Sequence, residues 1–425
     1  MVNPTDPLQN ENIDAKTALK ALRLKNLGRL IVGYLNINSI RNKLDALSEI
    51  NSQNIDILMI SETKIDSSFP KQQFVIDGYS VPLRLDRTKD GGGLLVYIRN
   101  GIVAHQLDSF TFAEGIECIS LEVNLNKKKW VLLSVYRPPT QSEDIFLDNL
   151  GRALAKYSGE FENAIILGDL NMTVNEGELN NFLDLYGLRN MIKEPTCFKS
   201  ENPKCIHLVL TNRDRSVHST TTIETGLSDF HKMILTVLKT KYQKIGASVI
   251  NYRSYKNFNE SDFKRDLCEA IGNTNPTDYE SFQDVFNEVL DKHAPTKKKY
   301  VRANHAPFMT RALRKAVMLR SRLKNKHNNS RTVENWNNFR KQRNRCVKLF
   351  RQAKRDYYNK LDINLVTDNR KFWKTVKPAL SDKCQSNNKI VLVEDDEIIS
   401  DDIEVAEILK SFLCNGNRGP WYKRK

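Results

Sequence analysis

The sequence predicts an α/β protein in which two packed sheets with outer helices precede a basic helical extension. Eight short apolar runs have the length of buried strands and end at Gly, Asn, Ser or charged residues. Few helical patterns separate these runs, which favours two sheets packed face to face over one doubly wound sheet. Beyond residue 240 the apolar runs give way to helical spacing dense in Lys and Arg.

The first 240 residues contain all eight expected strands. They cover 30–36, 55–61, 94–98, 118–123, 130–135, 164–167, 205–211 and 231–238. Because most of these runs are continuously apolar, both faces of each sheet are expected to be covered. The helical patterns in this part cover 15–24, 44–50, 145–157 and 178–186. Residues 1–27 are expected to form a polar, loosely held lead-in.

The second part of the chain is expected to be helical. Residues 241–256 have the composition of a linker, and 257–380 form the basic helical region. Helices are expected at 257–270 and 279–293, followed by two long basic amphipathic helices that pair as a hairpin. The aromatic residues of these helices, such as Trp336 and Phe339, are expected in the core. Residues 381–425 are expected to be a partly disordered tail.

The positive charge is concentrated in the helical region. Residues 291–377 hold 26 Lys and Arg against 5 Asp and Glu, whereas the rest of the chain is slightly acidic. Acidic partners one helical turn away are nearly absent, which favours nucleic-acid contact over a merely solvated face. The partner is expected to be DNA, with RNA as a further partner of the basic helices. The candidate contacts are Arg314, Lys315, Arg340, Lys341, Arg343 and Arg345.

Cysteine usage and hydropathy indicate where the protein acts. Seven dispersed Cys without a CxxC or a zinc-site spacing are typical of reduced, intracellular thiols. No apolar run approaches the roughly 18 residues needed to span a bilayer, and the polar N-terminus has no secretory signal pattern. We expect an intracellular protein, nuclear or cytoplasmic, that is not secreted and has no membrane partner.

Polar side chains gather where the expected strands end. The run AIILGDLN places Asp169 and Asn171 after a short buried strand. Two readings are open for this run alone, a simple Gly-Asp turn or a site at the mouth of a sheet. Similar residues elsewhere favour the site: Asn36, Glu62, Tyr136, His207, Asp229 and His231 all lie at or beside strand ends.

These residue types suit phosphodiester hydrolysis. Magnesium prefers one or two carboxylates together with water and substrate phosphate. A further carboxylate and an amide can orient water, and an imidazole or a phenol can stabilise an oxyanion. The expected cofactor is Mg²⁺, with Mn²⁺ as the alternative ion and no small-molecule cofactor.

The motifs resemble those of the endonuclease/exonuclease/phosphatase superfamily. They are LNIN (35–38), SETK (61–64), VYRPP (135–139), GDLN (168–171), CIHLVLTN (205–212) and GLSDFH (226–231). In detail the sequence is most similar to the apurinic-type endonuclease domain of LINE-type (non-LTR) retrotransposon polyproteins, without the reverse transcriptase. The resemblance implies a four-layer α/β sandwich with mostly antiparallel sheets over residues 28–240.

The resemblance also implies a role for each matching residue. Glu62 would bind the divalent metal, and Asn36 would orient Asp169, which aligns or deprotonates the attacking water. Tyr136 would contact the scissile phosphate, Asn171 would stabilise that phosphate, and His231 would stabilise the transition state. Asp229 belongs to the same motif as His231. Arg84 and Arg87 are weaker candidates for DNA contact.

Two positions depart from the pattern that the resemblance implies. His207 stands where an Asp is expected to pair with the catalytic His, and two adjacent imidazoles would each disfavour protonation of the other. Phe230 separates Asp229 from His231, and along a strand this offset turns one side chain to the other face. We therefore expect weakened catalysis. The alternatives are a catalytically inert nucleic-acid-binding remnant and a phosphatase acting on a small phosphate ester.

Overall fold

The structure is a computed structural model with two compact units, Gly246–Ala303 and the remainder of the chain. It describes residues 13–112, 116–125, 128–157, 163–174, 177–241, 249–300, 308–359, 392–394, 397–399 and 402–414. Each unit is considered by itself below.

The first sheet has six strands in the order β11–β12–β1–β2–β4–β3. They are β1 (Arg29–Asn36), β2 (Ile57–Ser61), β3 (Leu83–Leu85), β4 (Leu94–Ile98), β11 (Val217–Ile223) and β12 (Met233–Lys241). Strands β1 and β2 are parallel, and all other neighbours in this sheet are antiparallel. Every residue of β2 and β4 is buried, as continuous apolar runs predict.

The second sheet repeats this plan in the order β5–β6–β7–β8–β10–β9. Its strands are β5 (Ala104–Thr111), β6 (Glu117–Leu125), β7 (Lys128–Tyr136), β8 (Asn163–Asp169), β9 (Arg189–Asn190) and β10 (His207–Thr211). Here β7 and β8 form the parallel pair, and the other pairs are antiparallel. Each sheet thus has one parallel pair near its centre.

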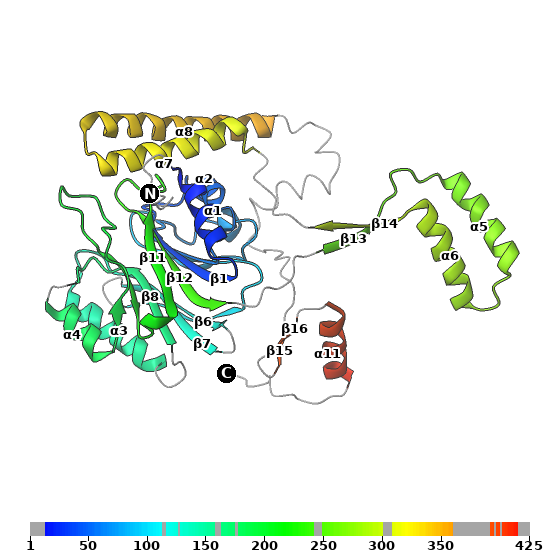
Figure 1. Cartoon of the computed structure of the whole chain (residues 1–425), viewed down its shortest axis with the longest axis horizontal. Coiled ribbons are helices and arrows are strands. Elements are labelled where there is room, and N and C mark those ends of the chain that lie inside the picture. Colours follow the sequence, from blue (N-terminus) through cyan, green and yellow to red (C-terminus); the bar gives the residue numbers. More distant parts are fainter. Residues whose placement is uncertain are drawn as a thin grey trace, which may run out of the picture. The chain divides into compact units, whose positions relative to one another are not determined.

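The two sheets pack face to face, and helices cover both outer faces (Figure 1). Apolar residues of both sheets, among them Tyr34, Met59, Leu132 and Leu167, fill the space between them. Helices α1 (Ala15–Lys25) and α2 (Leu44–Asn51) cover the first sheet, and α3 (Glu143–Tyr157) and α4 (Gly177–Leu185) cover the second. This four-layer arrangement, called the sandwich below, confirms the predicted fold class.

Helix α1 is more firmly attached than a loose lead-in would be. Its buried face consists of Ala15, Ala18, Leu19 and Leu22, which have the spacing of an amphipathic helix and join the core under the first sheet. The Arg23 guanidinium lies 2.6 Å from the fully buried Asp56 carboxylate. Residues 13–25 are therefore part of the sandwich.

Two basic helices follow, as expected, and lie side by side on the α1–α2 side of the sandwich (Figure 1). They are α7 (Arg311–Asn329) and α8 (Val333–Asn359). Leu313, Val317 and Phe350 join the core that also contains α1 and α2, and Phe339 is fully buried. Apolar and aromatic residues at helical spacing thus form the packed face, which leaves most of the Lys and Arg outside.

The unit Gly246–Ala303 pairs a two-stranded antiparallel sheet with two helices. Its elements are β13 (Val249–Arg253), α5 (Glu260–Thr274), α6 (Tyr279–His293) and β14 (Thr296–Tyr300). Strand β13 lies in the segment expected to be a linker, and its partner β14 carries the Lys297–Lys299 run. Antiparallel backbone pairing joins the two strands, although β14 has the polar sequence TKKKY.

The segment expected as a partly disordered tail contains secondary structure. It includes β15 (Leu392–Glu394), β16 (Glu397–Ile399) and α11 (Asp402–Cys414). Residues 381–391 and 415–425 lie outside the described part. The described part also contains the short helices η1 (Lys71–Phe74) and η3 (Asp214–Ser216). Among the described helices, none is both long and apolar enough to cross a bilayer.

Candidate active site

The candidate site lies where the parallel pairs of the two sheets end. Asn36 is the last residue of β1, and Glu62 directly follows β2. Tyr136 and Asp169 end β7 and β8 and lie opposite each other in register. Because parallel strands end at the same edge, each pair delivers two polar side chains to one place.

Hydrogen bonds join these four residues across the two sheets. The Asn36 amide nitrogen donates to Asp169 Oδ2 at 2.8 Å and to Glu62 Oε1 at 3.2 Å. The Tyr136 hydroxyl donates to the same Glu62 oxygen at 3.0 Å. With Asn171, these residues are called the carboxylate side. Asn36 thus connects both carboxylates, although 133 positions separate it from Asp169.

Asp169 is buried yet held in its ionised form. Burial acts to raise the pKa of this carboxyl, but the adjacent His207 imidazole and the Asn36 amide outweigh it and hold the pKa below its usual range. The Asn171 backbone N–H donates to Asp169 Oδ1 at 3.2 Å, and the Asp169 backbone N–H donates to the Tyr34 hydroxyl at 2.8 Å. A fixed, ionised carboxylate can accept a proton from water.

The loops of the carboxylate side have an unusual backbone. Asn38, Ser39, Glu62, Lys64 and Asn171 all have positive φ values between 46° and 74°. L-residues seldom adopt this conformation, and such residues concentrate at functional sites where the surroundings enforce it. The enforcing contacts include the Ser39 N–H, which donates to the Glu62 carbonyl at 2.7 Å.

Glu62 has the surroundings of a hard-cation ligand. Its side chain is 21 % exposed, so water and a substrate phosphate can reach it. Asn36 and Tyr136 both donate to Oε1, and the nearest cation to Oε2 is the Lys64 ammonium at 3.6 Å. A carboxylate oriented through one oxygen and accessible at the other fits Mg²⁺, which binds few carboxylates and retains water.

Asn171 and Arg137 lock the loop after β8. The Arg137 guanidinium is 2 % exposed and donates to the carbonyls of Leu170 at 2.6 Å and Asn171 at 2.9 Å. In return, the Asn171 amide donates to the Arg137 carbonyl at 2.7 Å. No sequence motif marks Arg137 for this role, because its two carbonyl partners lie 33 and 34 positions away in the chain. One N–H of the Asn171 side-chain amide is therefore used to bind the Arg137 carbonyl.

The second part of the site, called the histidine side, consists of His207, Asp229 and His231. His207 begins β10 directly opposite Asp169, with Nε2 at 3.5 Å from Oδ2. Its ring stacks on that of His231 with centroids 4.8 Å apart. Burial, followed by the proximity of His207, lowers the pKa of His231 to about 3. His231 is thus neutral at neutral pH.

Asp229 and His231 have different partners. Asp229 forms an ion pair with Arg343 of α8 at 2.6 Å, whereas His231 faces His207 and Asp169. His231 pairs with Cys197 in an isolated bridge, so the segment around Phe230 runs beside the 196–204 loop before β12 begins. The Phe230 offset thus separates the carboxylate from the imidazole.

Glu117 is a buried carboxyl that the sequence analysis missed. It starts β6 opposite Tyr136 and accepts the Gly93 N–H at 2.6 Å. Burial raises its pKa to about 7, and the nearby Glu62 charge adds to the rise. No motif marks Glu117, because it appears as one polar position in an alternating strand. Only its register with Tyr136 places it near the site.

The candidate nucleic-acid contacts differ in how exposed their side chains are and in whether they already have an ion-pair partner. Arg84 is 7 % exposed at its side chain and donates to Asp86 and to the carbonyls of Phe69 and Asp66. Arg87 is more accessible and lies 3.5 Å from Glu117. On the hairpin, Arg314 pairs with Glu49 and Arg343 with Asp229. The remaining candidates, Lys315, Arg340, Lys341 and Arg345, are exposed.

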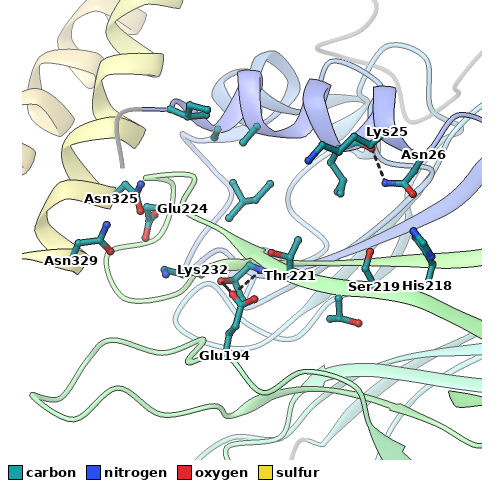
Figure 2. Close-up of a pocket in the computed structure, with 17 residues that line it drawn as sticks. Lys25, Asn26, Glu194, His218, Ser219, Thr221, Glu224, Lys232, Asn325 and Asn329 are labelled. Atoms are coloured by element: carbon teal, nitrogen blue, oxygen red, sulfur yellow. Dashed lines mark hydrogen bonds between the residues drawn. The ribbon is translucent and has the colours of Figure 1, made fainter. Parts of the chain in front are cut away.

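A separate pocket of about 650 Å³ lies between α1, β11 and α7 (Figure 2). Its walls include His218, Thr221, Glu224 and Asn325. None of the expected catalytic residues is among the described residues that line it. This pocket is therefore distinct from the candidate site.

Comparison with known proteins bears on the same segment of the chain. Residues 33–230 match the model of the Endonuclease/Exonuclease/phosphatase family. The predicted resemblance is thereby confirmed for this segment, which contains all of the carboxylate side. The family comprises hydrolases that act on phosphoester bonds. No curated protein matches the sequence.

Several solved structures are similar to the sandwich. The endonuclease domain of TRAS1, a telomere-specific non-LTR retrotransposon, has 15% identity and a TM-score of 0.39, covering 49% of this chain and 98% of its own. The 3′-5′ exonuclease NExo from Neisseria meningitidis has 14% identity and a TM-score of 0.41, with 49% and 99% coverage. An AP endonuclease from Archaeoglobus fulgidus has 15% identity and a TM-score of 0.39, with the same coverage. The named activities are those of these proteins.

Proposed function

We propose that the chain is a Mg²⁺-dependent phosphodiesterase, a DNA-nicking endonuclease of retrotransposon origin that acts inside the cell, in the nucleus or the cytoplasm. One observation carries the proposal: Asn36 hydrogen-bonds both Asp169 and Glu62 at the meeting point of the two parallel pairs. This arrangement holds a buried, ionised carboxylate beside an accessible one. Phosphodiester hydrolysis needs that combination, because one group must take a proton while positive charge is held near the phosphate.

In the proposed reaction, Asp169 accepts a proton from the water molecule that attacks phosphorus. The phosphorus–oxygen bond to one nucleotide breaks, and its leaving oxygen takes up a proton from solvent, which gives a phosphate end and a hydroxyl end. Asn36 and the Asn171 N–H keep the Asp169 carboxylate oriented. Tyr136 is neutral because burial and Glu62 raise its pKa, and its hydroxyl, which donates to Glu62 Oε1, would contact the phosphate from beside that carboxylate. When bound at Glu62, Mg²⁺ or Mn²⁺ would supply positive charge to the phosphate oxygens.

The DNA backbone is proposed to extend onto the basic helices. Lys315, Arg340, Lys341 and Arg345 are exposed and have no ion pair among the described residues. Phosphate contacts of this kind make binding depend steeply on salt, with a slope of about 0.9 per neutralised phosphate. RNA is a second ligand for the same surface.

A supercoiled-plasmid nicking assay tests this proposal. We expect nicking with Mg²⁺ that EDTA abolishes and that both Glu62→Ala and Asp169→Ala eliminate. Nicking that survives both substitutions would disprove the assignment of the site. Turnover of small phosphate esters but not of plasmid would instead identify a phosphatase.

A second candidate function is nucleic-acid binding without catalysis. It is favoured by the neutral His231, which cannot offer the positive charge expected of it at the phosphate. Under this alternative, DNA binding would persist with full salt dependence while no nicking occurred with Mg²⁺ or Mn²⁺.

A further inference from the structure

The histidine side brings three potential metal ligands together. Asp169, His207 and His231 each offer one ligand atom, and these atoms all lie within 4.8 Å of one another. The β8–β10 register fixes the first two, since His207 lies directly opposite Asp169. The His231 ring is held against His207 by stacking. Glu62, the proposed Mg²⁺ ligand, is not part of this group.

Three imidazole nitrogens of this cluster make no hydrogen bond with the described residues. His207 is fully buried, and its Nε2 lies 3.5 Å from Asp169 Oδ2, but neither ring nitrogen makes a well-formed hydrogen bond with a described residue. The Nδ1 atom of His231 is also buried without one. Buried polar atoms are nearly always satisfied, and an exception calls for an additional group such as an ion. The unsatisfied atoms belong to the two residues that flank Asp169.

The ligand chemistry selects the kind of ion. Two imidazoles and one carboxylate are the donor set of transition-metal sites, where Zn²⁺, Fe²⁺, Co²⁺ and Ni²⁺ bind. Magnesium, in contrast, prefers oxygen ligands and retains its water. The cluster and Glu62 therefore suit different ions.

We propose that Asp169, His207 and His231 form a binding site for a divalent transition metal, separate from the Mg²⁺ position at Glu62. His207 creates this site, because without it the cluster would hold only one imidazole, that of His231. An ion bound here occupies the Asp169 carboxylate. One consequence rests on the proposed function: Zn²⁺ would inhibit Mg²⁺-dependent nicking, because Asp169 could no longer accept a proton from water.

Cobalt binding to the full chain tests the site without reference to activity. Titration with Co²⁺ alone, followed by visible absorption, is expected to show one site with bands of four- or five-coordinate Co²⁺, which Zn²⁺ displaces. We expect His207→Leu and His231→Gln each to weaken Co²⁺ binding at least tenfold. His105→Gln, an exposed histidine, and Cys197→Ser, the nearby thiol, serve as matched controls and should bind as the parent does.

The outcomes separate the inference from the proposed function. Unchanged Co²⁺ binding in both histidine variants, or loss in Cys197→Ser alone, would overturn the metal site. Melting curves without metal establish that each variant folds. If His207→Leu, which lies in strand β10, does not fold, His231→Gln still tests the site because His231 lies outside the strands. Co²⁺ binding in a protein that does not nick DNA would support the site and contradict only the nuclease.

Discussion

The two sides of the candidate site are built differently. On the carboxylate side, Asn36, Glu62, Tyr136 and Asp169 are joined by hydrogen bonds between strand ends of the two sheets. On the histidine side, both imidazoles have unsatisfied nitrogens, and Asp229 is paired with helix α8 rather than with a histidine. The carboxylate side is thus held by hydrogen bonds within the sandwich, whereas on the histidine side Asp229 depends on a helix outside it.

This difference shows which residues can be replaced without disturbing the geometry of the other site residues. The Asn36 amide fixes both carboxylates, so the carboxylate side keeps its geometry whatever occupies position 207. A histidine at that position alters only charge and protonation nearby, where it helps lower the pKa of His231. We therefore expect any weakening of the proposed reaction to arise on the histidine side, while the carboxylate side keeps its geometry.

The largest effect is expected at Asp169. In the proposed reaction Asp169→Asn removes the proton acceptor but keeps the shape, so nicking should fall by about 10³-fold, within the range for general bases. Initial rates of plasmid nicking measure it. Asp184→Asn, an exposed site on α4, is the control and should retain full activity. Equal losses in both variants would remove Asp169 from the mechanism.

The second largest loss of nicking activity is expected for a substitution of Glu62. Glu62→Gln preserves the hydrogen-bonding shape but removes the charge that would hold Mg²⁺, so we expect about a 10²-fold loss and a higher Mg²⁺ requirement. Rates across a Mg²⁺ titration separate these effects. The exposed Glu178→Gln is the matched control. An unchanged Mg²⁺ dependence would place the ion elsewhere.

His207→Asp tests the weaker side directly. A carboxylate here would raise the pKa of His231 and favour its charged form, so nicking at neutral pH should rise by about tenfold. His207→Asn, neutral and of similar size, should give no gain. If His207→Asp leaves nicking unchanged, the missing carboxylate does not limit the reaction.

The ion pair between Arg343 and Asp229 should have a smaller effect. Both side chains are about one-third exposed, and such pairs contribute roughly 0.2–1 kcal/mol. We expect Arg343→Ala to lower kcat by about threefold with little change in Tm, and Arg343→Lys to restore most of it. The neighbouring exposed Arg345→Ala should affect DNA binding but not kcat. The reverse pattern would make Arg343 a DNA contact only.

The last effect is absent at neutral pH and appears in the stability of the fold at low pH. The folded-state pKa of His231 is about 3, below its unfolded value of about 6.5, so the unfolded chain binds more protons between these values. Stability should therefore fall as pH drops from about 6.5 toward 3. His231→Gln should flatten the fall in Tm over pH 6 to 4 relative to His105→Gln. Parallel curves would contradict the lowered pKa.

Much of the sandwich was predictable because its central strands are apolar on both faces. The apolar runs that form β2, β4 and β8 can be recognised as strands from the local sequence alone. Strands β5 and β11 were missed because AHQLDSFT and VHSTTTI are too polar to show apolar periodicity. They form because an antiparallel neighbour pairs their backbone groups.

The sequence by itself determined which residues end the strands, because local apolar runs and the polar residues after them are short-range patterns. Asn36, Glu62, Tyr136 and Asp169 were found in this way. The family resemblance implied that Asn36 orients Asp169, and the structure joins the two residues across 133 positions. Only the tertiary structure decided the other partners: His207 lies opposite Asp169, and Arg343 reaches Asp229. Such contacts depend on sheet register and helix packing, which no local pattern of side chains specifies.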